Sequence, residues 1–204
     1  MSNLGTCIRS ALQDWAMGQM DEYRPAALET AYGRVLEVGF GTARNLTHYP
    51  PGVSSLAGVD PLPAASARVQ ARMRAAPFPV EHHALRADGA LPFDTCSFDT
   101  IVTTWTLCSI PEPLRALAEM RRVLRPGGRF LFIEHGRSER PATARWQDRL
   151  NPLWVRVAGG CNMNRAIESL VQEGGFELTA CRRFLGKGPR VLATLFQGIA
   201  LRRD

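Results

Sequence analysis

Two closely spaced glycines and an acidic residue are the first group whose types and spacing suggest chemistry. Gly39 and Gly41 follow a run of strand formers in the segment RVLEVGFGTARN. The first permits a tight turn, and the second lets the backbone approach a ligand closely. Asp60 ends the next expected strand, where a carboxylate can accept hydrogen bonds from both hydroxyls of a ribose. The combination predicts a nucleoside cofactor.

The turn departs from a dinucleotide fingerprint. Arg44 stands where the pattern G-x-G-x-x-G requires a glycine, which disfavours NAD as the cofactor. Ala43 stands where a third glycine could be expected. Because that position mainly serves the packing of the following helix, we expect alanine there to be a mild change.

Reactive and aromatic residues in the second half form another group. His135 follows an expected strand beside Glu134 and is our candidate for a general base, although it could also only hydrogen-bond a loop. Cys161 could border a substrate or could be a small buried residue near a helix start. Trp146 and Trp154 could form an apolar pocket, and they could equally be core aromatics.

The cysteine pattern bears on metal binding and on the redox compartment. The chain has five cysteines, an odd number, and no two of them have C-x-x-C spacing. This pattern disfavours a disulfide framework or a zinc site and favours a reducing compartment. We therefore expect no bound metal and a cytoplasmic protein.

Alternating strand and helix signals must position these residues. Strands are expected at residues 35–38, 55–59, 80–85, 98–104, 130–134, 176–184 and 191–199, and helices at 42–48, 61–76, 111–125 and 164–173. The alternation predicts an α/β fold with a doubly wound, mostly parallel sheet and helices on both faces. No helix signal separates the last two strands, so we expect them to form an antiparallel hairpin at the sheet edge.

Length and charge indicate one globular domain with a basic second half. The chain has 204 residues and a net charge of +6; residues 1–100 hold 8 Arg/Lys and 10 Asp/Glu, whereas residues 101–204 hold 17 and 9. We see no transmembrane run and no secretory signal. The basic half could face an anionic substrate, a membrane surface or nucleic acid. Because the arginines are scattered and not interleaved with aromatics, we expect no nucleic-acid partner.

A helical pattern precedes the first expected strand. The apolar residues at helical spacing are Ile8, Leu12, Trp15, Ala16 and Met20. This stretch could be a lid over the cofactor, a weak contact with a lipid surface, or a helix packed on the sheet edge. We expect residues 1–30 to form a helical lid.

Four segments resemble the motif series of class I S-adenosylmethionine-dependent methyltransferases, in order and at the usual spacing: VLEVGFGTARNL, GVDPLP, ADGALPFDTCSFDTIV and EMRRVLRPGGRFLFIEHG. The resemblance covers roughly residues 30 to 200 and implies a seven-stranded, Rossmann-like sheet with S-adenosyl-L-methionine as the cofactor. It also implies the cofactor contacts: Glu37, Gly39 and Gly41 at the methionine end, Asp60 at the ribose, Asp88 at the adenine amino group, and Thr104 or Trp105 at the methionine amino group.

A narrower resemblance concerns the acceptor half of the chain. Three segments look like elements of the alkyl-thiol methyltransferases: TLCSIPEPLRAL, EHG and ARWQDRLNPLWVRVAGGCNMNR. The matching positions are Trp146, Gln147, Pro152, Trp154, Gly160, Cys161 and Arg165. The resemblance implies an acceptor-side insertion at residues 137–163, with Trp146, Trp154, Cys161 and Arg165 at the substrate. Bacterial phospholipid N-methyltransferases and quinone C-methyltransferases share the earlier motifs.

We therefore expect a single methyltransferase domain over residues 1–204, acting on a small molecule, with a thiol as the first choice. A thiol has a pKa of ~8.5 and its thiolate attacks readily, so a nearby base such as His135 would suffice. N-, O- or C-methylation of a phospholipid, amine, phenol or quinone is the alternative. A nucleoside- or RNA-binding module without turnover and an NAD oxidoreductase are disfavoured.

Overall fold

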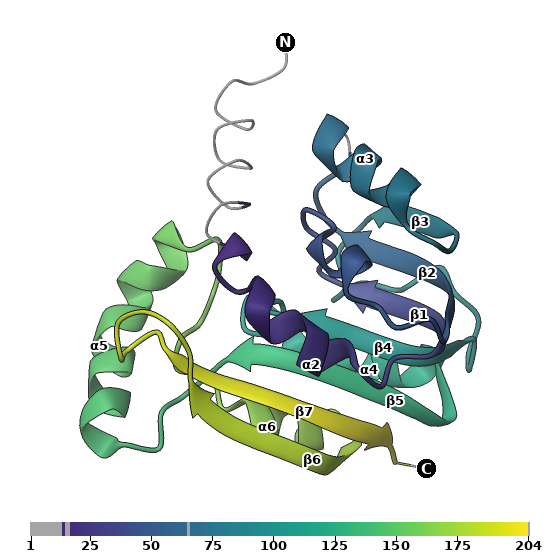
Figure 1. Ribbon diagram of the computed structural model, residues 1–204. Helices are drawn as coiled ribbons and strands as arrows, with labels where there is room; N and C mark the ends of the chain where they lie inside the picture. Colours follow the sequence, from purple (N-terminus) through teal and green to yellow (C-terminus); the bar gives the residue numbers. More distant parts are fainter. Residues whose placement is uncertain (1–13, 15–16, 65, 204) are drawn as a thin grey trace.

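One seven-stranded mixed sheet organises the computed structural model, which describes residues 14, 17–64 and 66–203 (Figure 1). The strand order across the sheet is β3-β2-β1-β4-β5-β7-β6. The strands are β1 (Gly33–Val38), β2 (Val53–Asp60), β3 (Val80–Ala84), β4 (Phe98–Thr104), β5 (Leu124–His135), β6 (Phe176–Leu185) and β7 (Thr194–Arg202). The first five strands are parallel, and β7 is antiparallel to both β5 and β6. The α/β class and the terminal hairpin are thus confirmed.

Helices cover both faces of this sheet. The helices are η1 (Asp21–Tyr23), α2 (Arg24–Leu28), η2 (Arg44–Thr47), α3 (Ala67–Ala75), α4 (Pro113–Val123), α5 (Pro141–Val157) and α6 (Ile167–Glu173). Figure 1 shows α2 in front of the sheet and α4 and α6 behind it. No helix of the described ranges is both long enough and apolar enough to cross a membrane.

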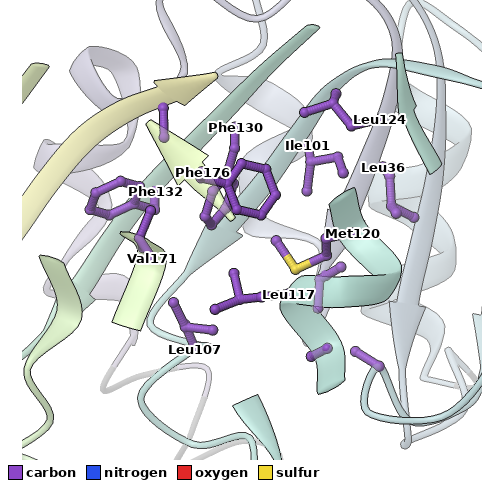
Figure 2. Close-up of a cluster of buried hydrophobic side chains, with 14 of the residues drawn as sticks. Leu36, Ile101, Leu107, Leu117, Met120, Leu124, Phe130, Phe132, Val171 and Phe176 are labelled. Carbon is purple, nitrogen blue, oxygen red and sulfur yellow. The ribbon is translucent and has the colours of Figure 1, made fainter. Parts of the chain in front are cut away.

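Strand alternation divides the apolar core between the two faces. In the cluster of Figure 2, Leu36, Ile101 and Phe130 point toward α4 and α6. Their neighbours Val35 and Val102 pack on the opposite face with residues of α2 and α3. Because successive side chains of a strand point to opposite faces, one continuous apolar run fills both cores.

The carboxyl ends of β1 to β5 meet at one edge of the sheet because these strands are parallel. The residues for which the sequence predicts a binding or catalytic role lie mainly at this edge. Ligands of open α/β sheets bind beyond the carboxyl ends of the strands. Helix α5 was not assigned from the sequence. It occupies most of residues 137–163 and stands beyond the carboxyl end of β5 (Figure 1).

The helix expected at residues 42–48 is only the 3₁₀ helix η2. Ala43, immediately before it, has a φ of +61°. That left-handed conformation does not belong to a right-handed helix, so an α-helix cannot run through this position. The helix expected at 111–125 ends at Val123, and β5 begins at the next residue.

Candidate active site

The glycine turn is tied to the end of β2 through Asp60. One carboxylate oxygen of Asp60 accepts a hydrogen bond from the Gly41 N–H at 2.9 Å, and the other accepts from the Leu62 N–H at 2.9 Å. These two bonds fix the orientation of the carboxylate at the carboxyl edge. Each oxygen keeps a further lone pair for a hydroxyl donor.

The three small residues of the turn have left-handed backbones for different reasons. Gly39 has a φ of +83°, and a Cβ there would overlap the Thr106 side chain. Gly41 has a φ of +51°, and a Cβ would meet nothing in the described part of the chain closer than 3.8 Å. Ala43 is fully buried at a φ of +61°. The absent third glycine therefore affects backbone strain, whereas we expected it to affect mainly helix packing.

A buried polar network lies beneath the turn. The Glu37 carboxylate accepts hydrogen bonds from Asn45 Nδ2 at 3.0 Å and from the Tyr49 hydroxyl at 2.8 Å. Asn45 also donates to Thr104 Oγ1 at 3.1 Å and accepts from Arg24 at 2.6 Å. Burial raises the pKa of Glu37 to about 7, although these hydrogen bonds and Arg24 favour the charged form. The network holds Glu37 and Thr104 together at the ends of β1 and β4.

The other two expected cofactor residues have distinct surroundings. Asp88 is buried after β3, and Arg86 donates to both of its oxygens at 2.9 and 2.7 Å. These bonds lower the pKa of Asp88. Trp105 has a φ of +51°, and its indole N–H finds no hydrogen-bond partner among the described residues. The Arg24 guanidinium lies over the Trp105 ring, 5.0 Å from its centroid.

An acidic residue near the N-terminus connects that segment to the cofactor side. Asp14 forms ion pairs with Arg44 at 3.0 Å, Arg68 at 2.6 Å and Arg72 at 2.9 Å. Burial alone would raise the pKa of Asp14, but the hydrogen bonds from Arg72 and its neighbours outweigh it and hold the pKa well below its usual range. Met20 contacts a small apolar cluster that contains Trp105. The expected lid residues Ile8, Leu12, Trp15 and Ala16 lie outside the described residues.

A histidine and two cysteines meet on the other side of the carboxyl edge. The Sγ atoms of Cys108 and Cys161 lie 3.6 Å apart, and Cys161 Sγ lies 3.9 Å from Nδ1 of His135. Both cysteines are buried free thiols. The contact with Cys108 and the His135 ring hold the pKa of the Cys161 thiol well below its usual range, with a contribution from Trp154. The same contact and burial raise the pKa of Cys108.

A buried carboxylate and a partly buried arginine hold the loop that carries Cys108. The Glu134 carboxylate accepts hydrogen bonds from the N–H groups of Thr106, Leu107 and Cys108 at 3.1, 2.9 and 3.2 Å. Arg165 donates to the carbonyl oxygens of the same loop at Leu107, 2.5 Å, and Ile110, 2.9 Å. Arg165 is thus placed beside the cluster, and its described hydrogen bonds are to the backbone.

The two expected acceptor tryptophans lie in different environments. Trp154 is half-buried on α5 near Cys161. Trp146 is 53% exposed, and Arg149 lies over its ring at 5.6 Å. Between them in the chain, buried Gln147 donates to the carbonyl oxygens of Gly136, Met163 and Val191 and accepts from the Ser138 N–H. Only Trp154 is therefore brought to the cysteine–histidine cluster.

Sequence reasoning assigned no individual role to five of these residues. Contacts between segments far apart in the chain place Asp14, Arg24 and Cys108. Asn45 and Tyr49 contact Glu37 over only 8 and 12 residues. Asn45 and Tyr49 follow the glycine turn closely enough that a search for polar residues after the turn could have found them. Arg24 and Asp14 precede the first strand, where no local pattern indicates a role.

The donor and acceptor chemistry of the carboxyl edge fits S-adenosylmethionine. That cofactor carries a sulfonium cation, an ammonium group, two ribose hydroxyls and an adenine amino group, all of which suit anionic or acceptor partners. The edge presents the carboxylates of Glu37, Asp60 and Asp88 at the ends of three neighbouring strands. These carboxylates can accept hydrogen bonds from the hydroxyl and amino groups of the cofactor, and their negative charge suits its cationic groups.

Comparison with known proteins identifies the class to which this fold is similar. A methyltransferase domain model matches residues 36–132. The [4+2]-cyclase SpnF has a TM-score of 0.69 at 19% identity, covering 91% of this chain and 80% of that one. The N-methyltransferase NodS from Bradyrhizobium japonicum, solved with S-adenosyl-L-homocysteine, has a TM-score of 0.63 at 18% identity, covering 93% and 87%. Residues 36–132 thus match a methyltransferase domain, and the chain as a whole resembles the class I S-adenosylmethionine-dependent methyltransferases.

The chain is also similar in sequence to methyltransferases whose acceptors are named. The human thiol S-methyltransferases TMT1A and TMT1B are 34% and 36% identical to this chain over 153 and 150 residues. These matches cover 70% and 68% of this chain but only 59% and 58% of the relatives. The phosphatidylethanolamine N-methyltransferase of Cereibacter sphaeroides is 34% identical over 132 residues, covering 62% of this chain and 64% of that protein. The chain therefore spans less than two thirds of each of these relatives.

Proposed function

We propose that this protein transfers the methyl group of S-adenosylmethionine to the sulfur of a small thiol. The observation that carries the proposal is the adjacency of two chemistries at one sheet edge. Carboxylates lie at the carboxyl ends of β1 and β2 and after β3, and the His135–Cys161–Cys108 cluster lies beyond the carboxyl ends of β4 and β5. The similarity to the human thiol S-methyltransferases supports sulfur as the acceptor atom.

The cofactor half assigns a role to each acidic strand end. Asp60 would accept from the ribose hydroxyls, Asp88 from the adenine amino group, and Glu37 would face the methionine end with Gly39 and Gly41. Thr104 and Trp105 would border the methionine amino group. When bound, the cofactor supplies an activated methyl group on a sulfonium, so the protein mainly has to align the attack and exclude water.

The acceptor half would prepare the thiol. His135 promotes the loss of the thiol proton, while Trp154, Cys161 and Arg165 border the acceptor. The exposed Trp146 would contact only an acceptor that extends beyond this cluster. The thiolate sulfur would then bond to the methyl carbon that the cofactor supplies, and the electrons of the broken carbon–sulfonium bond would stay on the cofactor sulfur. A thiolate needs no further activation because it is intrinsically nucleophilic.

The remaining parts of the chain would complete one catalytic domain. We assign residues 1–204 to a single methyltransferase domain, in which residues 137–163 shape the acceptor side. Residues 1–30 would act as a lid, which the ion pairs of Asp14 support. The free thiols Cys96, Cys108, Cys161 and Cys181 support a reducing compartment such as the cytoplasm.

The first experiment is methyl transfer from S-adenosylmethionine to a mixed panel of thiols, amines, phenols, quinones and phospholipids, read by mass spectrometry. We expect methylated thiols. Methylation of other acceptors with thiols untouched would discard sulfur as the acceptor atom. That outcome would favour N-, O- or C-methylation, which the similarity to phosphatidylethanolamine N-methyltransferase supports as the second candidate.

Asp60→Ala tests the cofactor half separately. The variant loses the carboxylate that would accept from the ribose, and it frees the Gly41 and Leu62 N–H groups. We expect S-adenosylmethionine affinity to fall more than about tenfold, since a charged hydrogen bond contributes about 1.5–3 kcal/mol. Calorimetric titration measures this change. Undiminished affinity would reject the ribose assignment.

A further inference from the structure

We propose that Cys108, His135 and Cys161 bind one Zn²⁺ ion at the acceptor side of the site. Their ligand atoms all lie within 4.8 Å of one another. Around a tetrahedral zinc, two sulfurs lie about 3.8 Å apart, and a sulfur and an imidazole nitrogen lie about 3.5 Å apart. The corresponding distances here are 3.6 Å between the sulfurs and 3.9 Å from Cys161 Sγ to His135 Nδ1. The ligands therefore need only small side-chain movements to enclose the ion.

The spacing of the cysteines in the sequence disfavoured a zinc site because the ligands come from three separate segments. Cys108 lies in the loop after β4, His135 ends β5, and Cys161 lies between α5 and α6. Cys161 lies 53 residues after Cys108 and 26 residues after His135 in the chain, and the fold brings the three together. Convergence of distant segments leaves no short motif to recognise.

The ligand types favour a soft or borderline ion. Two cysteines and one histidine suit Zn²⁺, whereas oxygen-rich sites select Mg²⁺ or Ca²⁺. Two thiolates also neutralise the charge of one Zn²⁺, so the buried site would add no uncompensated charge. Cys108 is fully buried, and Cys161 is only 8% exposed.

The surrounding contacts hold the ligands in place, as those around metal sites do. Glu134 anchors the N–H of Cys108. Asn162, next to Cys161, donates its backbone N–H and its side-chain amide to the Cys108 carbonyl oxygen at 2.9 and 3.1 Å. The loops that carry the two cysteines are thus joined directly to each other.

Three ligands leave one position of a tetrahedral zinc for water or substrate, as in catalytic zinc sites. This step rests on the proposed function: the acceptor thiol takes the fourth position, releases its proton to solvent, and attacks as a zinc-bound thiolate. His135 then promotes deprotonation as a metal ligand and does not need to act as a general base. The electrons and the methyl group move as in the transfer described above.

The test measures metal binding by the reduced full-length protein without any acceptor. Co²⁺ is the probe, because thiolate ligands give cobalt a charge-transfer band in the near ultraviolet. We expect one Co²⁺ per chain, displaced by one equivalent of Zn²⁺. A reduced wild-type protein that shows no such band overturns the proposal.

Ligand variants locate the site. Cys108→Ser and Cys161→Ser should each weaken Zn²⁺ binding more than about tenfold and diminish the band. His135→Ala should weaken binding but keep the band per bound ion. Cys181→Ser is the matched control, because this half-buried thiol lies on β6 outside the cluster. A band that survives in both ligand cysteine variants also overturns the site.

A second measurement needs no substitution and so avoids variants that fail to fold. Zn²⁺ should slow the alkylation of Cys108 and Cys161 below its rate in the zinc-free wild-type protein and leave the rates at Cys96 and Cys181 unchanged, as mapped by peptide mass spectrometry. Equal protection of all four overturns the assignment. Metal binding without thiol methylation would reject the proposed function and leave the site intact. Undiminished thiol methylation by the metal-free protein would reject the catalytic role of the ion.

Discussion

The alanine at position 43 strains the backbone, but its buried methyl group stabilises the fold. Ala43 is fully buried and has a φ of +61°, a conformation that costs an alanine about 1–2 kcal/mol and a glycine almost nothing. Ala43→Gly would remove that strain but would lose about 0.8 kcal/mol of methyl burial and gain unfolded-state entropy. We expect the free energy of unfolding to change by less than about 0.5 kcal/mol in urea denaturation.

Gly39→Ala gives the contrast at the same turn. Its φ of +83° is strained for alanine, and the added Cβ overlaps Thr106. The free energy of unfolding of this variant should fall by more than about 2 kcal/mol in urea denaturation. Equal stability losses in the two variants would contradict the distinction between the positions.

The raised pKa of Glu37 makes stability depend on pH. The pKa is about 7 in the folded protein and 4.5 for an ordinary glutamate. The folded state therefore keeps a proton that the unfolded state has lost, and stability falls as pH rises from about 4.5 to 7. Glu37→Gln should abolish this loss, which is at most about 3 kcal/mol.

Urea denaturation of the cofactor-free protein at pH 5 and pH 8 measures this difference. The exposed Glu29→Gln is the matched control and should follow the wild-type pH dependence. A Glu37→Gln variant with the wild-type pH dependence would show that Glu37 is already ionised in the folded protein at pH 5.

At the scale of the elements, one buried side chain fixes α5. Gln147 is 1% exposed and hydrogen-bonds the end of β5, the loop before α6 and the loop before β7. Gln147→Leu leaves these backbone groups without a partner, and we expect a loss of about 2–4 kcal/mol. Because α5 carries Trp154, the KM for the acceptor should rise more than that for the cofactor.

Thermal unfolding and steady-state kinetics measure the two effects of Gln147→Leu. The exposed Gln172→Leu on α6 is the control and should leave both unchanged. A normal acceptor KM in a destabilised Gln147→Leu protein would separate the docking of α5 from acceptor binding.

The elements themselves were largely predictable because the sheet strands are apolar and their ends are marked. Strand Phe98–Thr104 was predicted with its observed bounds, and the terminal hairpin followed from the lack of an intervening helix. Helix α5 was not recognised, because its exposed apolar residues Trp146, Leu153 and Val157 and its internal Pro152 obscure the usual pattern.

The candidate site was predictable where one strand and its following turn determine it. Gly39, Asp60 and His135 lie at strand ends, so their common edge follows from parallel pairing. The contacts of Arg24 with Asn45, and of Cys108 with Cys161, span 21 and 53 residues. Such pairs depend on how separate loops pack, which local patterns do not encode.

At the scale of the whole molecule, Asp14 connects the N-terminal segment to the cofactor side. Its carboxylate meets arginines of η2 and α3, and Arg72 also donates to the carbonyl oxygen of Thr42 in the glycine turn. Asp14→Asn would leave Arg68 and Arg72 without the carboxylate that they share, whereas Arg44 would keep its ion pair with Asp21. We expect the N-terminal segment to detach more often and the turn to lose support.

Limited proteolysis and calorimetric titration test this coupling. Asp14→Asn should speed cleavage before β1 and weaken S-adenosylmethionine binding by about fivefold or more, as for a group coupled by at least about 1 kcal/mol. Glu22→Gln is the control, because its ion pair with Lys187 is exposed on both sides and should contribute little. Faster cleavage with unchanged cofactor affinity would show that the segment packs on the domain without covering the cofactor. Unchanged cleavage would show that Asp14 does not hold the segment in place. Faster cleavage together with weaker cofactor binding would show that Asp14 holds a segment that covers the cofactor.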